Sequence, residues 1–294
     1  MMTTLINGSP TTCIDVHDRG LHYGDGVFET FAVRNGIPAL WDMHMQRLML
    51  SCQRLNFPEI DPALLWSETI SLLQSNAKSG SSGVAQGVLK IIITRGSGGR
   101  GYRAPSSSAA LTKGGTTRIL ALYPWPEYPA TFWSEGVAVR VCATRLGRNP
   151  ALAGIKHLNR LEQVVARSEW DDGDVPEGLM LDTQGNVIEG TMTNLFVVCN
   201  GQILTPDVSQ CGVAGVMRGW VLACARAAGI PAAITALTLD TVTAADEVFV
   251  CNSVIGLWPV RKISDLSDIT ECSFQVNGPI TLGIMAKLRD SAAS

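Results

Sequence analysis

Hydrophobic and polar positions follow strand periodicity and then helix periodicity along the first hundred residues. "TLING" and "GVFETFAVRNGIPAL" predict strands, and the Asn35-Gly36 pair inside the second predicts a hairpin turn. "DMHMQRLMLSCQRLNF" places its apolar residues on one helix face, with Asp42 as the N-cap. Asp61 and Pro62 predict the start of a second helix, "DPALLWSETISLLQSNA". The near-continuous apolar run "GVLKIIITRG" predicts a strand in the interior of a sheet.

A stretch of small and polar residues, "APSSSAALTKGGTT", interrupts this pattern at residues 104–117. It has no periodicity, which is typical of a linker between domains. We therefore predict a smaller N-terminal α/β domain over residues 1–110 and a larger C-terminal domain over residues 118–294.

Beyond the linker, strands and helices continue without an internal repeat. The pattern predicts strands in "RILALYP", "GVAVRVCAT", "GLMLD", "VIEG", "TNLFVVC", "QILTP" and "EVFVCN", and one near residues 234–239. It predicts helices over about 158–170, 213–228 and 240–245, and another at the carboxy terminus. This order indicates an α+β protein of two unequal domains.

Composition and charge exclude several classes of protein. Hydrophobic residues make up 46% of the chain and charged residues 17%, which is ordinary for a globular protein. A net charge of -3 argues against a nucleic-acid surface or an anionic-membrane binder, because both need clustered positive charge. The eight cysteines form no C-x-x-C pair, which favours free thiols in a reducing cytoplasm over disulfides or zinc. The four histidines form no metal-binding pattern either, and "MMTTLINGSP" lacks the features of a secretory signal. We expect a cytoplasmic protein without a metal.

The motif "GSGGRG", residues 96–101, has the spacing of a dinucleotide-binding loop. Such a loop needs a helix to begin there and receive the pyrophosphate, but "YRAPSSS" follows instead. We therefore reject nucleotide binding. What remains is a turn that presents a cation, Arg100, and a phenol, Tyr102. Taken alone, it is most simply a solvated loop tip.

Lys156 is the strongest chemical candidate in the chain. It follows "ALAGI", an apolar stretch that could desolvate the amine, lower its pKa and make it nucleophilic. The positive end of the helix predicted to follow would act in the same direction. Such a lysine suits a Schiff base with an aldehyde, and pyridoxal phosphate is the commonest such partner. The alternative is an ordinary lysine at a helix entry.

Three further residues or motifs complete the minimum equipment of a pyridoxal phosphate site. Glu189, in "NVIEGTMTNLFVV", could hold the proton of the pyridine ring, although a strand-end carboxylate in water is the simpler alternative. The glycine-rich helix start "CGVAGVMRGW" could offer the amides of Val216 and Met217 to a phosphate. Arg47, in "HMQRL", could supply a cation for it. Each signal is weak alone.

Six motifs occur in order and resemble the successive motifs of the fold-type IV pyridoxal phosphate enzymes: "YGDGVFET", "HMQRL", "GIKHLN", "VIEGTMTNLF", "GVMR" and "EVFVCNSV". This group includes the branched-chain and D-amino-acid aminotransferases and the aminodeoxychorismate lyases. The resemblance runs from about residue 5 to residue 260. "RGSGGRGY" and "LGRNPALAGIKHLNRLEQ" are similar to the lyases rather than to the aminotransferases. The resemblance to the fold-type IV enzymes implies a homodimer. Each chain would have two domains, as in D-amino-acid aminotransferase, with a barrel-like sheet in the larger domain.

The resemblance also assigns roles to residues of this sequence. It implies that Lys156 binds the cofactor as a Schiff base and that Glu189 pairs with the pyridine nitrogen. It implies that the cofactor phosphate is held by Arg47, by the amides of Val216 and Met217, and by Asn252 with Ser253. Met217 stands where relatives often have threonine, so a hydroxyl is missing and the amide remains.

On the substrate side, the resemblance implies that Arg100 and Tyr102 reach the neighbouring subunit's site and meet a substrate carboxylate. The pocket would be lined by Phe28, Glu29, Thr30 and Asn159. Glu29 beside Thr30 resembles the D-amino-acid aminotransferase pattern as much as that of the lyases.

These roles imply the conversion of 4-amino-4-deoxychorismate to 4-aminobenzoate and pyruvate, a step of folate synthesis. Freed Lys156 would act as base and then as acid. One rival is a fold-type IV aminotransferase acting on D-amino or branched-chain amino acids. A second is a non-enzymatic binding protein in which Lys156 and Glu189 are incidental.

Overall fold

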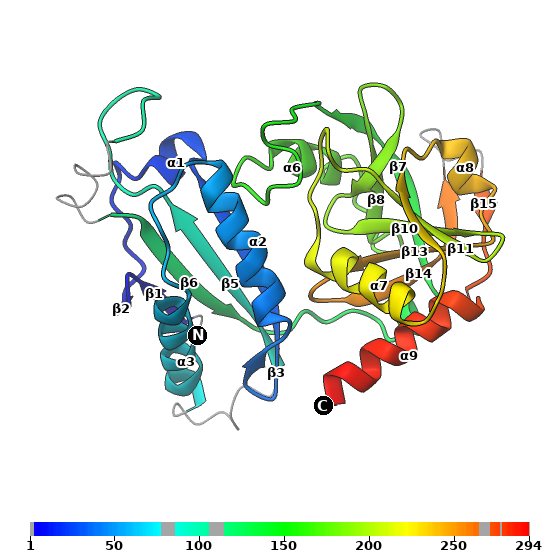
Figure 1. Cartoon of the computed structure of the whole chain (residues 1–294), viewed down its shortest axis with the longest axis horizontal. Helices are drawn as coiled ribbons and strands as arrows, with labels where there is room; N and C mark the ends of the chain where they lie inside the picture. The colour runs from blue at the N-terminus through cyan, green and yellow to red at the C-terminus, as the bar shows by residue number, and fades with distance from the viewer. Residues whose placement is uncertain (1–2, 78–85, 106–114, 265–270, 277, 294) are drawn as a thin grey trace. The chain divides into compact units, whose positions relative to one another are not determined.

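The computed structural model describes residues 3–77, 86–105, 115–264, 271–276 and 278–293 (Figure 1). The chain forms two compact units. The amino-terminal unit comprises Met1–Glu127 and Ile155–Asn159, and the carboxy-terminal unit comprises Tyr128–Gly154 and Arg160–Ser294. Two stretches of the chain therefore build the amino-terminal unit, which the sequence did not indicate.

The amino-terminal unit is built on a six-stranded antiparallel sheet in the order β2-β1-β6-β5-β3-β4. Its strands are β1 (Thr3–Ile6), β2 (Ser9–Pro10), β3 (Gly26–Arg34), β4 (Ile37–Pro38), β5 (Gln86–Thr94) and β6 (Thr117–Tyr123). The Asn35-Gly36 hairpin is confirmed, and both residues have the positive φ, 51° and 76°, that such a turn requires. The interior position of β5 is also confirmed.

Strand β6 corrects the predicted domain boundary. The predicted second domain starts at residue 118, but β6 pairs with β5 and β1 of the first sheet. The small, polar segment before β6 therefore connects two strands of one sheet rather than two domains. Its residues 106–114 lie outside the described part of the chain.

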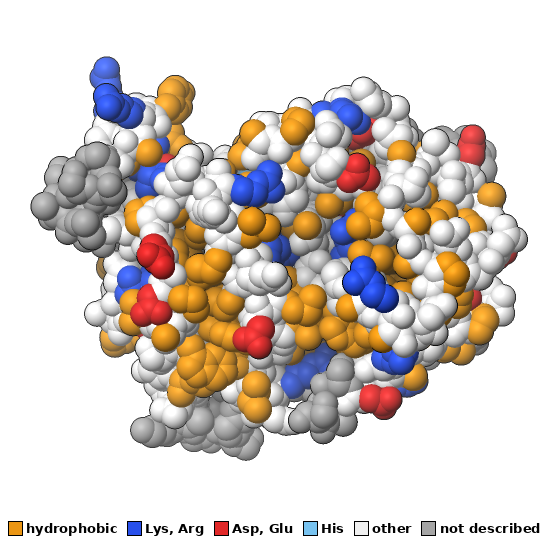
Figure 2. Space-filling model, in the orientation of Figure 1, with side chains coloured by type: hydrophobic (Ala, Val, Ile, Leu, Met, Phe, Trp, Pro, Cys, Tyr) orange, Lys and Arg blue, Asp and Glu red, His pale blue; other side chains and the backbone are white. Residues whose placement is uncertain are grey.

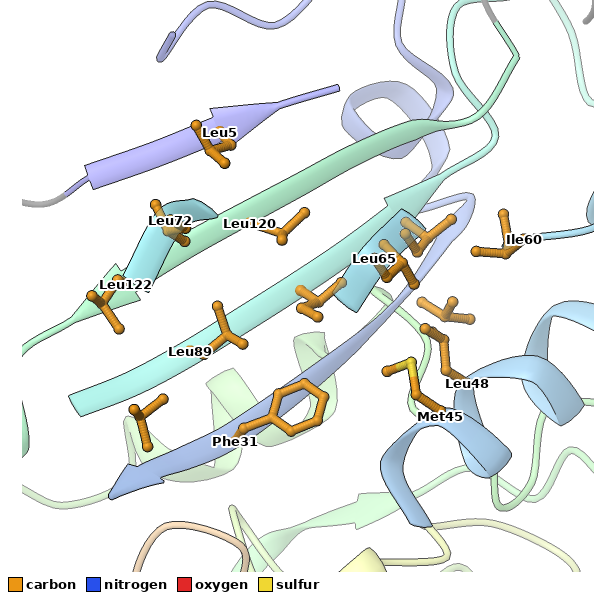
Figure 3. Close-up of a cluster of buried hydrophobic side chains, with 14 of the residues drawn as sticks. Leu5, Phe31, Met45, Leu48, Ile60, Leu65, Leu72, Leu89, Leu120 and Leu122 are labelled. Atoms are coloured by element: carbon orange, nitrogen blue, oxygen red, sulfur yellow. The ribbon is translucent and has the colours of Figure 1, made fainter. Parts of the chain in front are cut away.

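Two long helices cover one face of this sheet, α2 (Trp41–Arg54) and α3 (Pro62–Ala77), and a short helix, α1 (Arg19–Tyr23), precedes β3. Buried leucine, isoleucine and aromatic side chains fill the space between this face and the two long helices (Figure 3). Asp61 caps α3 as predicted, because its Oδ1 accepts from Ala63 N at 2.8 Å. Asp42 does not cap α2; the N-cap is Leu40, whose φ is 54°.

The carboxy-terminal unit contains a mixed sheet in the order β12-β11-β10-β13-β14-β7-β8-β9, with β15 beside β14. These strands are β7 (Val137–Leu146), β8 (Glu177–Asp182), β9 (Val187–Gly190), β10 (Asn194–Cys199), β11 (Gln202–Pro206), β12 (Ala232–Thr235), β13 (Glu247–Asn252), β14 (Gly256–Ser264) and β15 (Glu271–Ser273). Strand β9 lies at one end of this order and β12 lies at the other. Val187 N of β9 donates a hydrogen bond to the carbonyl of Leu237, just after β12, at 2.8 Å. The sheet therefore curls toward closure, which confirms the barrel-like core.

The helices of this unit are α5 (Thr131–Ser134), α6 (Leu161–Arg167), α7 (Val216–Ala227), α8 (Leu239–Thr243) and α9 (Pro279–Ala293). Helix α6 is shorter at both ends than the predicted helix over 158–170. Its start is delayed because Leu158 N donates to Gly26 O, so the chain is still paired with a strand there. Strand β14 was missed by the sequence analysis. Among the described residues, the structure contains no helix that is long and apolar enough to span a membrane.

The distribution of charged side chains and the state of the cysteines can be compared with the expectations from composition. Basic and acidic side chains are interspersed over the face shown in Figure 2. All eight cysteines are free, and four of them, Cys52, Cys142, Cys211 and Cys251, are buried. Burial raises the pKa of each of these four thiols to about 12.

Candidate active site

The segment that carries Lys156 is extended and pairs with β3 in the amino-terminal unit. Phe28 N donates to Lys156 O at 3.0 Å, and Val27 and His157 form an antiparallel bridge. Ile155 lies 1% exposed in the hydrophobic core of this unit. Successive side chains of an extended segment point to opposite faces, so Lys156 is directed away from that core. The backbone thus fixes the direction in which the amine leaves the chain.

The amine of Lys156 lies over the ring of Phe28, 4.4 Å from the ring centroid. A second amine, that of Lys90, lies 4.9 Å from the same centroid. Lys90 stands opposite Thr30 in the β3–β5 register, and burial lowers its pKa. The sequence analysis missed Lys90, although a lone charge in the run "GVLKIIIT" was the available signal. Phe28, Thr30, Lys90 and Lys156 therefore belong to one side of this sheet.

On the opposite face of β3, Glu29 joins Arg47 and His44 of α2 in a buried cluster. Arg47 Nε donates to Glu29 Oε1 at 2.8 Å, and Arg47 Nη2 donates to Oε2. His44 Nδ1 lies 2.6 Å from Glu29 Oε2 and is the donor, because an ionised carboxylate only accepts. Glu29 is 1% exposed. The structure thus makes Glu29 the orienting partner of Arg47, and its place in the substrate pocket stays a prediction.

The pKa values in this cluster follow from burial and charge. Burial raises the pKa of Glu29, but the charge of Arg47 and the hydrogen bonds from His44 and Arg47 outweigh it, and the net pKa is lowered. Burial lowers the pKa of His44 despite its contact with Glu29, and the charges of Arg47 and Lys156 add to this effect. At neutral pH these shifts leave Glu29 ionised and His44 neutral.

In the carboxy-terminal unit, Glu189 lies on β9 and is 3% exposed. Its Oε1 accepts from Gln163 Nε2 at 3.2 Å, and its Oε2 accepts from Val213 N at 2.8 Å. The alternative reading, a strand-end carboxylate in water, is wrong for this structure. Val213 lies in the loop before α7, and its carbonyl accepts from Asn194 Nδ2 at 2.9 Å. One loop is thereby fixed to both Glu189 and the neighbouring strand.

The amino end of α7 follows this loop and includes Val216 and Met217. The N-cap is Gly215, which has no side chain to occupy the first amides of the helix. A Cβ at Gly215 would lie 1.9 Å from Asn194 Oδ1, so any side chain there would displace the Asn194 amide. Arg218 in the same turn is 7% exposed and donates through Nη2 to Pro206 O at 2.9 Å. This is a helix start with uncapped amides beside a buried cation, suited to an anion.

Asn252 and Ser253 lie where β13 turns into β14. Asn252 Oδ1 accepts from Val254 N at 2.8 Å and from Ile255 N at 2.9 Å. Asn252 Nδ2 donates to Met192 O at 3.2 Å. The side chain of Asn252 therefore shapes the turn that presents Ser253, and it ties this turn to the loop after Glu189.

A buried carboxylate that the sequence analysis missed organises that loop. Glu177 is 0% exposed and accepts from Thr191 N at 2.8 Å, Thr191 Oγ1 at 2.6 Å, Met192 N at 3.1 Å and Thr193 Oγ1 at 2.8 Å. These donors belong to one turn, Thr191–Thr193, between β9 and β10. No local pattern in "PEGLML" indicates this role, because the donors come from a later part of the chain.

Residues 96–105, the described part of the loop with Arg100 and Tyr102, contain no helix. Tyr102 is 88% exposed. Asn159, predicted to line the pocket, donates through Nδ2 to Gly24 O at 3.1 Å and so supports the turn after α1.

The predicted site residues thus fall into two sets. The amino-terminal unit contains Lys156, Arg47, Phe28, Glu29, Thr30, Arg100, Tyr102 and Asn159. The carboxy-terminal unit contains Glu189, Val216, Met217, Asn252 and Ser253. Among the described residues, no three His, Cys, Asp or Glu side chains form a group that could hold a metal ion.

Comparisons with known proteins show which family this chain resembles. Residues 26–263 match the family described as amino-transferase class IV. The chain is 38% identical to the aminodeoxychorismate lyase of Vibrio harveyi over 261 residues, 88% of this chain and 90% of that protein. A crystal structure of 4-amino-4-deoxychorismate lyase from Pseudomonas aeruginosa is 43% identical, with a TM-score of 0.87 and 98% of each chain covered. A putative branched-chain-amino-acid aminotransferase of Methanocaldococcus jannaschii is 30% identical over 85% of this chain and 82% of that protein.

Proposed function

This chain belongs to the class IV aminotransferase family, and we propose that it is a pyridoxal phosphate-dependent lyase that converts 4-amino-4-deoxychorismate to 4-aminobenzoate and pyruvate. The observation that carries the proposal is its similarity to aminodeoxychorismate lyases over nearly the whole chain, which includes both sets of site residues. The reaction belongs to folate synthesis. The eight free cysteines support placing it in a reducing cytoplasm.

The described residues fit the cofactor. Lys156 supplies an amine that can bind its aldehyde, and Glu189 supplies a buried carboxylate for its ring nitrogen. The phosphate would be held by the uncapped amides of Val216 and Met217, with Ser253 and Arg47. When bound, the cofactor accepts the electron pair released at the substrate carbon that bears the nitrogen.

The chain's own groups would then move the protons. Lys156 Nζ removes the proton from the amine-bearing carbon and later returns a proton to the methylene carbon of the leaving enolpyruvyl group. Glu189 stabilises a proton on the ring nitrogen, and hydrogen bonds from Gln163 and Val213 help to hold the carboxylate in place for this task. Phe28 and Thr30 line the substrate side.

On the substrate side, Arg100 and Tyr102 bind a carboxylate, because guanidinium matches carboxylate with two parallel hydrogen bonds. We place this contact in the neighbouring subunit's site of a homodimer, on the basis of the family resemblance. The substrate carries two carboxylates, so a loop that presents the cationic side chain of Arg100 can contribute to its recognition.

The test is to supply purified protein with aminodeoxychorismate and measure 4-aminobenzoate and pyruvate. We expect the two products in equal amounts. Lys156→Ala should remove both turnover and the visible absorbance of the bound cofactor, because no amine remains to bind it. Lys90→Ala is the matched control, since it removes the other amine over Phe28, and it should keep that absorbance. Full lyase activity in Lys156→Ala would contradict the assignment.

The similarity to the Methanocaldococcus jannaschii protein supports a second candidate, an aminotransferase. D-Alanine or a branched-chain amino acid, supplied with 2-oxoglutarate, tests it. Keto-acid formation faster than aminobenzoate formation would favour this candidate over the lyase.

A further inference from the structure

Arg19, the first residue of α1, uses its guanidinium to hold a loop far away in the sequence. Its Nη1 donates to Gly101 O at 2.9 Å and its Nη2 donates to Tyr102 O at 3.1 Å. Its Nε donates to Asp25 Oδ2 at 2.8 Å. Arg19 is only 3% exposed, whereas Tyr102, whose carbonyl it binds, is 88% exposed. A buried cation therefore donates hydrogen bonds to the backbone of an exposed loop.

Asp25, which pairs with Arg19, is itself held by a second arginine. Arg95 donates through Nε to Asp25 Oδ1 at 3.0 Å and Oδ2 at 2.9 Å. Arg95 also donates to Leu55 O and Asn56 O, each at 2.8 Å, at the carboxy end of α2. Asp25 is thus fixed between two arginines, one of which is attached to a long helix. Arg19 consequently has little freedom to move with the loop.

Tyr23 adds a second hold on the same loop. Its hydroxyl accepts from Gly101 N at 3.1 Å, and its ring packs edge-on against the ring of Tyr102, 5.5 Å between centroids. Arg19 Cζ lies 4.8 Å from the centroid of the Tyr23 ring. Gly101 itself has a φ of 98°, a conformation that other residues rarely adopt. Both peptide groups of Gly101 are therefore held, directly after Arg100.

We propose that Arg19 is a positioning residue for substrate recognition: it fixes the Gly101–Tyr102 backbone so that Arg100 and Tyr102 meet a substrate carboxylate in one geometry. This inference rests on the proposed function, because it takes from it the role of those two side chains. A long exposed arginine loses much rotamer entropy on binding, and a fixed backbone reduces the further cost of ordering the chain. Arg19 acts through the loop and does not itself touch the substrate.

The first experiment measures how fast trypsin cleaves the loop when no substrate is present. Trypsin cleaves after arginine, and Arg100 and Arg103 lie in this loop, so cleavage at these two bonds reports its opening. Arg19→Lys keeps the charge but loses the planar fork that binds two carbonyls at once. We expect cleavage at Arg100 and Arg103, located by mass spectrometry, to accelerate roughly tenfold.

Arg118→Lys is the matched control. Arg118 belongs to the same unit and forms an ion pair with Glu68 at 2.6 Å, with 19% of its side chain exposed. Its cleavage rate at Arg100 and Arg103 should equal that of the wild type. Equal acceleration in Arg118→Lys and Arg19→Lys would mean general loosening of the unit and would overturn the proposal.

The second experiment is steady-state kinetics with aminodeoxychorismate. In Arg19→Lys we expect KM to rise about tenfold while kcat changes less than about twofold and the cofactor absorbance is unchanged. Tyr23→Phe, which removes a single hydroxyl, should shift KM in the same direction by a smaller factor and serves if Arg19→Lys folds poorly. Unchanged KM in a variant whose loop is cleaved faster would overturn the proposal.

The two experiments separate this inference from the proposed function. Wild-type protein without lyase activity would remove the proposed function, and with it the substrate role of the loop. The cleavage rates would still decide whether Arg19 holds the loop. If the wild type is an active lyase, and if Arg19→Lys has the same KM and the same cleavage rate as the wild type, the inference about Arg19 is wrong while the proposed function stands.

Discussion

The two units hold their functional side chains in different ways. In the amino-terminal unit, arginines and carboxylates position one another, as in the pair of Arg47 with Glu29 and the pair of Arg19 with Asp25. In the carboxy-terminal unit, the folded chain provides the donors, as when the Thr191–Thr193 turn surrounds Glu177. The first arrangement depends on charge, and the second depends on the shape of turns.

This difference suits the proposed tasks of the two units. Arg47 and Arg100 are long cations that must meet anions, and a buried carboxylate such as Glu29 selects one orientation of such a side chain. Glu189 must stay fixed while the reaction proceeds, and it accepts hydrogen bonds from two neutral donors, Gln163 Nε2 and Val213 N. The two units should therefore respond differently to loss of a charge.

The largest effect is expected from Glu29→Gln. This change leaves the charge of Arg47 buried without its carboxylate, and breaking such a pair costs about 3–5 kcal/mol of the free energy of unfolding. Urea denaturation measures the loss. Glu68→Gln is the control, because its partner Arg118 is more exposed than Arg47, and the loss of stability should be smaller there. Equal losses in the two variants would break the comparison.

A smaller effect is expected from Glu177→Gln. The new amide keeps one oxygen acceptor but turns an NH₂ group toward donors, which costs about 1–3 kcal/mol. Cofactor affinity should fall with it, because the Thr191–Thr193 turn is bonded to Asn252. Fluorescence titration of the apoprotein with pyridoxal phosphate checks this. Glu169→Gln is the matched control: Glu169 accepts from Ala143 N and Thr144 N, away from this turn, so unchanged affinity is expected there.

The smallest effect is a pH dependence that arises in the amino-terminal unit. The pKa of His44 is lowered from 6.5, mainly by burial, so the unfolded chain takes up this proton first and stability falls as the pH drops below 6.5. The pKa of Glu29 is lowered from 4.5, because Arg47 and His44 outweigh burial, so its contribution is present above 4.5 and lost at lower pH. Denaturation midpoints from pH 7.5 to 5 should therefore decrease, and His44→Gln should flatten this slope. An unchanged slope in His44→Gln would contradict a buried neutral histidine.

Sequence patterns predicted the elements whose causes are local. The Asn35-Gly36 hairpin, the cap of α3 at Asp61 and the buried strand β5 each depend on residues within a few positions. The family resemblance, the fold class and the barrel-like core are also confirmed. The roles of Lys156, Glu189 and the other site residues stay predictions.

The features that the sequence did not reveal are non-local. Helix α6 begins late because the chain around Leu158 is paired with β3, more than a hundred residues earlier. Strand β14 was missed because Pro259, Arg261 and Lys262 interrupt its apolar pattern. Arg19 and Glu177 gave no signal, because their partners, Gly101 and Thr191, lie far along the chain.

The insertion of residues 155–159 into the amino-terminal unit has a consequence for synthesis on the ribosome. Ile155 belongs to the core of that unit, yet it is made 28 residues after Glu127, where the first stretch of the unit ends. At about 5–20 residues per second, translation takes roughly 2–6 s to proceed from residue 127 to residue 159. During this interval the nascent unit lacks the segment that pairs with β3. Lys156 therefore reaches its place only when the unit that receives it is otherwise complete.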